Sequence, residues 1–129
     1  MTTRRMFLRS AALLAGAQSL PAAATRTIGL GLGNYGLKTY PTDEAIKYIA
    51  SLGYDSVELT MMDGYTTEAG KVSAAERRKI RTQLGDLGLA LPSLLEQIPI
   101  LGDAAQHKEH LERIRRDAQF GKDVNAGVC

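Results

Sequence analysis

The stretch IGLGLGNYGLKTYPTDEAIKYIASLGYDSVELT, residues 28–60, decides the fold that we expect for this chain. At its start, apolar residues alternate with glycine. Successive side chains of a strand point to opposite faces, so the alternation predicts a strand that packs Ile28, Leu30 and Leu32 and leaves a bare face of glycines. The rest of the stretch predicts a helix followed by a second strand.

The helix of this stretch is expected to begin with Thr42 as its N-cap, before two acidic residues that suit a first turn. It is expected to end at Gly53, because glycine readily adopts the left-handed backbone that follows a last helical turn. The strand YDSVELT comes directly afterwards. Its alternation places Val57 and Leu59 on one face and Glu58 on the other.

Two further strand and helix units are predicted downstream. The sequence SAAE at residues 73–76 matches a capping box and starts a second helix, which Gly88 ends. Residues 89–98, LALPSLLEQI, predict a third strand, although Pro92 is awkward in a central strand. A third helix is expected over residues 103–121. The buried positions expected in these two helices are Ile80, Leu84, Leu87, Leu111, Ile114 and Ala118. Three such units with short connections predict an α/β chain with a parallel sheet.

The glycines of the first strand also spell Gly31-x-Gly33-x-x-Gly36, the dinucleotide-binding fingerprint. In that fold the helix opens directly at the fingerprint, so that the pyrophosphate meets the helix N-terminus. Here the expected helix start at Thr42 comes about six residues too late for the fingerprint. Glu58 nevertheless lies about 20 residues on, where a ribose-binding acid is expected, so a Rossmann-type NAD(P)-dependent oxidoreductase remains an alternative. The other interpretation is that the glycines line the inside of a barrel strand.

The segments GNYGLKTYPTDEAIKYIASLGYDSVELT and LGDLGLALPSLLEQI, residues 33–60 and 84–98, resemble the sugar phosphate isomerase/epimerase family, whose members have xylose-isomerase-like TIM barrels. The likeness covers residues 28 to about 121. It implies that residues 25–129 are the first three βα units of a truncated TIM (β/α)8 barrel.

Members of that family bind a divalent metal through carboxylates and a His on later strands, and they move a proton between adjacent carbons of a sugar. The resemblance implies a carbohydrate or sugar phosphate as the ligand. We expect a fragment that holds no cofactor and is inactive by itself, with the divalent metal belonging to a full-length relative. A non-catalytic sugar-binding or assembly module of the same fold is a second alternative.

The candidate catalytic residues are Glu58 and Glu96, because each lies near the end of a predicted strand, where barrel sites are built. Glu58 is expected to point inside the barrel and to bind a sugar hydroxyl or support a metal ligand. Asn34, Tyr35 and Tyr65 lie in the loops after the strands and are the candidate substrate-binding residues. No residue of this chain is predicted as a metal ligand.

Other charged groups are interpreted as solvated helix faces. His107 and His110 lie three residues apart in a charged segment and do not match the zinc-protease pattern. The basic runs at residues 77–79 and 113–116 are expected to be exposed and interleaved with acids. No basic stripe with interleaved aromatics occurs, so nucleic acid is not an expected partner.

Residues 1–24 are predicted to be a twin-arginine export signal. Arg4 and Arg5 precede a short apolar segment that ends in a small-residue cleavage site. This segment is too short and too rich in alanine to be a membrane span. Of the 16 Lys and Arg residues, three lie in the signal, whereas all 14 acids lie beyond it, so the mature net charge is −1. A periplasmic or extracellular protein without a membrane span is expected, one that self-associates through open sheet edges.

Overall fold

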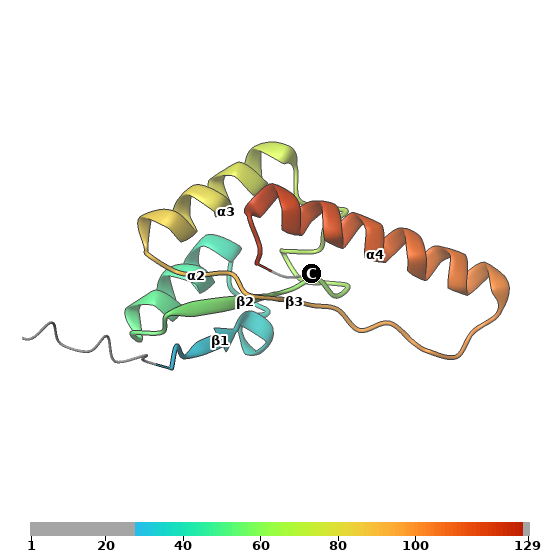
Figure 1. The fold of residues 1–129 in the computed structure, drawn as a ribbon, viewed down its shortest axis with the longest axis horizontal. Helices are drawn as coiled ribbons and strands as arrows, with labels where there is room; N and C mark the ends of the chain where they lie inside the picture. The colour runs from blue at the N-terminus through green and yellow to red at the C-terminus, as the bar shows by residue number, and fades with distance from the viewer. Residues whose placement is uncertain (1–27, 128–129) are drawn as a thin grey trace, which may run out of the picture.

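The computed structural model describes residues 28–127, so the predicted export signal at residues 1–24 lies outside the described residues. The chain alternates strands and helices as a mixed α/β fold (Figure 1). In chain order the elements are β1 (Gly31–Gly33), the 3₁₀ helix η1 (Asn34–Leu37), α2 (Thr42–Ser51), β2 (Ser56–Thr60), α3 (Ala74–Asp86), β3 (Leu94–Leu95) and α4 (Ala104–Val124).

The three strands form one parallel sheet in the order β1-β2-β3, which confirms the predicted α/β class and parallel pairing. Gly33 of β1 is paired with Glu58 of β2. β3 is shorter than the predicted strand over residues 89–98, and an isolated bridge joins Ala90 to Ser56 before Pro92 interrupts the pairing.

The hydrophobic core lies between the sheet and the helices that follow each strand. Val57 and Leu59 of β2 are fully buried, as their alternation predicted. The helices contribute Ile46, Ile49, Ile80, Leu84, Phe120 and Val124 to the same core. All three helices therefore cover one face of the sheet, and the face that carries Glu58 is left to the site described below.

The packed face predicted for the first strand is wrong in part. Ile28 and Leu30 are 89% and 62% exposed, and only Leu32 packs against the core. β1 is an edge strand, and β2 pairs with it on one side. Leu32 is opposite Val57, within reach of the core, whereas Ile28 and Leu30 precede that point of the sheet.

The helix starts follow the sequence with one correction. Ser73 and Glu76 form the predicted capping box of α3, and Asp103 forms one with Gln106 at α4. Thr42 is the first residue of α2 rather than its cap, and its hydroxyl pairs with that of Thr66 at 2.8 Å. A tertiary hydrogen bond thus replaces the predicted capping interaction.

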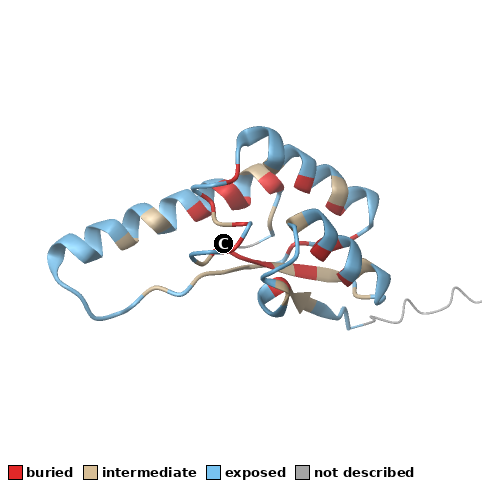
Figure 2. Cartoon of the chain, turned by 180° about the vertical axis from the view of Figure 1, so that it is seen from behind, coloured by how far each residue is buried: buried red, intermediate tan, exposed pale blue. Residues whose placement is uncertain are grey.

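The buried face of α4 differs from the predicted one. Leu111 and Ile114 are 53% and 49% exposed, and Ala118 is exposed as well. The helix instead runs through Gly121 to Val124 and buries Asp117, Phe120, Gly121 and Val124. Figure 2 shows that buried residues are confined to the C-terminal half of α4, while its N-terminal half extends beyond the sheet. Leu87 of α3, also expected to be buried, is 40% exposed at the helix end.

Each of the three helices ends at a residue in the left-handed conformation. Gly53, Gly88 and Asn125 have φ angles of 82°, 65° and 66°. Two of these are glycines, as predicted, and the third is an asparagine, the non-glycine residue that tolerates this backbone best. After Asn125, the Gly127 N–H donates to the Leu91 carbonyl at 2.8 Å. The turn after α4 therefore returns the chain to the sheet in the way that the two earlier turns do.

None of the helices within residues 28–127 is long and apolar enough to cross a membrane.

Candidate functional site

The open face of the sheet is lined by small and polar residues near the carboxyl ends of the strands. A Cβ at Gly31 would lie 2.5 Å from the Ser56 hydroxyl, and one at Gly33 would lie 3.3 Å from Oε1 of Glu58. These glycines therefore give room to the side chains of β2 beside them. This supports the prediction that the glycine face and Glu58 share one side of the sheet.

Glu58 is half-buried on this face and has one side-chain partner. The hydroxyl of Ser93 donates a hydrogen bond of 2.7 Å to Oε2 of Glu58. Ser93 lies just before β3, so two neighbouring strands bring a carboxylate and a hydroxyl together. An ionised carboxylate has about four lone-pair positions, so Glu58 retains acceptor capacity for a ligand hydroxyl.

The candidate residues of the loops lie at the same end of the sheet, although Asn34 is used by the fold. Its side chain is 3% exposed, and Oδ1 accepts a 2.8 Å hydrogen bond from the Thr60 N–H. Asn34 thus satisfies the last backbone donor of β2, where no strand residue of β1 remains to do so. The first loop is thereby fixed to the end of β2.

Tyr35 and Tyr65 stack on each other, with ring centroids 6.0 Å apart. The Tyr65 hydroxyl donates to the Tyr35 carbonyl at 2.9 Å, and burial raises the pKa of the Tyr65 phenol above its ordinary value. The ammonium of Lys38 lies 4.9 Å from the centre of the Tyr65 ring. Because Tyr65 is buried and Tyr35 is 57% exposed, Tyr35 presents the accessible ring of the pair.

Glu96 has a different environment from Glu58. Arg113 of α4 binds its carboxylate with two hydrogen bonds of 2.7 and 3.0 Å, and the Glu96 side chain is 12% exposed. Arg113 also forms an ion pair of 3.2 Å with Asp63, in the loop after β2. The structure therefore gives Glu96 a helix residue as its partner and does not join it to the Glu58 and Ser93 pair.

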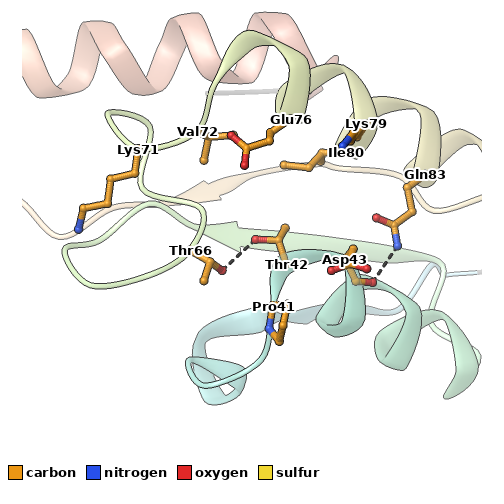
Figure 3. Close-up of a pocket in the computed structure, with 10 residues that line it drawn as sticks. All are labelled: Pro41, Thr42, Asp43, Thr66, Lys71, Val72, Glu76, Lys79, Ile80 and Gln83. Carbon is orange, nitrogen blue, oxygen red and sulfur yellow. Dashed lines mark hydrogen bonds between the residues drawn. The ribbon is translucent and has the colours of Figure 1, made fainter.

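A separate cleft of about 490 Å³ lies between the first turn of α2, helix α3 and the loop that precedes α3 (Figure 3). Its lining residues include two acids, Asp43 and Glu76, and two lysines, Lys71 and Lys79. The amide of Gln83 donates to the Asp43 carbonyl across it at 2.8 Å. Glu58 does not line this cleft, which lies on the helical side of the sheet.

The two histidines of α4 lie near each other, with ring centroids 6.4 Å apart. Over residues 28–127, no group of three or more His, Cys, Asp or Glu side chains is placed so that it could hold a metal ion.

Sequence reasoning missed three partly buried polar residues. Ser93 had no motif to mark it, and only the register of the strands brings it to Glu58. Arg77 and Arg113 were expected on solvated faces, yet their side chains are only 17% and 22% exposed. In each basic run, the partly buried arginine is the one that forms an ion pair with an acid from another part of the chain, Arg77 with Asp123 and Arg113 with Glu96.

No protein-family model and no curated protein matches this chain.

Proposed function

We propose that residues 28–127 form the first βα units of a (β/α)8 barrel similar to the sugar phosphate isomerases and epimerases. In this proposal, the carboxyl ends of the strands bind a carbohydrate or sugar phosphate. Barrel enzymes build their sites at that end of the sheet, from the loops that follow the strands. Glu58 is the carboxylate that binds a sugar hydroxyl, and the exposed ring of Tyr35 lies in the loop after β1.

The path of the chain after α4 is the observation that carries this proposal. The Ala90 carbonyl accepts from Val57 of β2, whereas the next carbonyl, of Leu91, accepts from Gly127. Successive carbonyls of an extended segment point to opposite edges, so Gly127 lies on the edge of the third strand segment that faces away from β2. A sheet that adds each new strand at that edge fits a barrel. In a dinucleotide-binding fold, the fourth strand returns beside β1 instead.

The chemistry of the family sets a limit on what this chain does alone. A hard divalent ion takes about six oxygen ligands, and isomerisation also needs a positioned base. Of the two candidate carboxylates, Glu96 is already bound by Arg113, which leaves Glu58. A divalent metal in a full-length relative would polarise the sugar oxygens, while Glu58 would orient a hydroxyl.

We expect the 129-residue chain to show no isomerase or epimerase activity above background. The assay uses a panel of ketoses and their phosphates with manganese, magnesium or cobalt. Activity that disappears in Glu58→Gln would contradict this expectation, because it would show that the site is complete in this chain or in its oligomers.

Sugar binding is the property that tests the proposed site. Glu58→Gln should weaken saturable binding of a sugar or sugar phosphate about tenfold, because a charged hydrogen bond of roughly 1.5–3 kcal/mol is replaced by a neutral one. The measurement is the shift of backbone amide NMR signals at the ends of β1 and β2 during titration. Glu44→Gln, an exposed change in the first turn of α2, is the matched control and should leave the affinity unchanged.

An activity assay and a cofactor titration separate the alternatives. A non-catalytic sugar-binding module would give the same binding and never gain activity when joined to the missing units. An NAD(P)-dependent oxidoreductase would instead bind a nicotinamide cofactor tightly, and Gly33→Ala would abolish that binding.

We also propose export through the twin-arginine route, on the basis of the motif at Arg4 and Arg5. The open edge of β1 supports a second proposal, that the chain self-associates through this strand.

A further inference from the structure

We propose that a protonated Asp117, hydrogen-bonded to the Glu96 carboxylate that Arg113 binds, forms a pH-sensitive latch that holds α4 against the end of β3. This inference concerns the attachment of a helix and does not rest on the proposed sugar site. The latch joins α4 to the segment that directly follows β3, two parts of the chain about 20 residues apart.

The first observation is a buried carboxyl oxygen without a donor. Asp117 is only 9% exposed, and its Oδ2 is enclosed with no hydrogen-bond partner when both carboxyls are ionised. A buried polar atom left unpaired costs roughly 1–3 kcal/mol, so such atoms are rare in folded proteins. A proton on Asp117 removes the defect, because the resulting O–H can donate to the carboxylate of Glu96, which lies within hydrogen-bonding reach.

The second observation is the count of charges around the pair. Arg113 binds Glu96 through a two-pronged contact, with Asp63 of the loop after β2 on the outside at 80% exposure. With Asp117 protonated, the Glu96 carboxylate and the Arg113 guanidinium balance each other. With Asp117 ionised, two buried carboxylates would share one guanidinium, and like charges so close together cannot both ionise without cost.

The neighbouring charged groups act on the protonation of Asp117 in both directions. Arg116 on α4 lowers the pKa of Asp117, as does Arg113, while burial and the Glu96 carboxylate raise it to about 6. From α3, Arg77 is engaged by Asp123 and lies over Phe120, one turn beyond Asp117. Burial and the Glu96 carboxylate together therefore raise the pKa of Asp117 by more than the two arginines lower it. This direction agrees with the unpaired Oδ2 of Asp117.

Because burial and Glu96 raise the pKa of Asp117 in the folded chain, the proton on Asp117 stabilises the fold at low pH. The ordinary pKa of an aspartate is 3.8 here, and the folded chain holds the proton to about pH 6. The contribution to stability is therefore fully present below about pH 4 and is lost as the pH rises through 6. Above that pH, α4 is held less firmly at its middle.

The test compares the full chain with Asp117→Asn by urea unfolding between pH 4.5 and 7.5. Asparagine resembles the protonated acid, since its amide can donate to Glu96 at any pH. Relative to this variant, the unfolding equilibrium constant of the unmodified chain should rise by about 25-fold between pH 4.5 and 7.5, because most but not all of a pKa difference of about two units is expressed within this range. Both histidines of α4 are present in both chains, so their titration cancels.

Two controls keep the outcome specific. Asp123→Asn removes an acid whose pKa is lowered by its hydrogen bond to Arg77, and it should leave the profile between pH 4.5 and 7.5 intact. Glu96→Gln should bring the midpoint of the Asp117 carboxyl signal, followed by carbon-13 NMR, below its value in the unmodified chain. Parallel pH profiles for the unmodified chain and Asp117→Asn, or a carboxyl midpoint near 4 in the unmodified chain, would overturn the latch.

Discussion

Replacing Phe120 by alanine is expected to remove a large part of the stability of the fold. Phe120 is fully buried and is the largest of the side chains that are, and the guanidinium of Arg77 lies 5.4 Å from its ring centre. Truncating a buried phenylalanine typically costs about 3–5 kcal/mol, against a total of about 5–15 kcal/mol for a small domain. Urea unfolding followed by circular dichroism should show a midpoint lowered by about a third or more.

The control for this change lies on the same helix. Leu111→Ala alters a residue that is 53% exposed and should change the free energy of unfolding by no more than about 0.5 kcal/mol. A loss at Leu111 as large as the loss at Phe120 would mean that α4 packs with the face expected from its leucine and isoleucine spacing, contrary to the structure.

Arg77→Met is expected to cost about 2–4 kcal/mol, the second-largest effect. Three of its nitrogens are engaged: Nε donates to the Val72 carbonyl at 3.0 Å, Nη2 to the Ala69 carbonyl at 2.8 Å, and Nη1 to Asp123 at 2.9 Å. Its loss leaves the Val72 and Ala69 carbonyls without this donor, and buried groups left unpaired carry the cost of their desolvation. Asp123 is 35% exposed and keeps the hydrogen bond from Gln119, so it adds little to this cost. The side chain therefore joins α3, α4 and the loop between β2 and α3.

Two companion variants sharpen the measurement. Arg78→Met, one residue along α3 and exposed, should leave the urea midpoint nearly unchanged. Arg77→Lys keeps the charge but cannot reach three acceptors at once, so it should restore only part of the stability. If the methionine and lysine variants both unfold at the same urea midpoint as the unmodified chain, Arg77 contributes nothing to the contact between α3, α4 and the loop before α3.

Local signals in the sequence were sufficient where one short segment determines the structure. The capping box at Ser73, the helix start at Asp103 and the glycine ends at Gly53 and Gly88 formed as predicted, because each depends on residues at most a few positions apart. The alternation around Glu58 likewise gave the correct face of the sheet.

The errors arose where a distant part of the chain supplies the partner. Thr42 bonds to Thr66 instead of capping α2, and no local pattern distinguishes those two uses of a threonine hydroxyl. On α4 the spacing of Leu111 and Ile114 suggested an apolar face, but the sheet is too short to reach that half of the helix, and the aromatic Phe120 packs instead. Glu96 does follow β3 as its sequence position indicated, but that position could not indicate its partner, Arg113.

The length of α4 beyond the sheet gives the two halves of this helix different roles in local unfolding. Its C-terminal half shares the core through Phe120 and Val124, so its backbone hydrogen bonds open only with the whole domain. Its first turns have mostly exposed side chains and are fixed by the capping box, whereas Arg113 binds Glu96 further along the helix. Solvent therefore reaches the amides of those turns by fraying of the helix end, and the charge state near Asp117 sets how far the fraying advances before it meets the core.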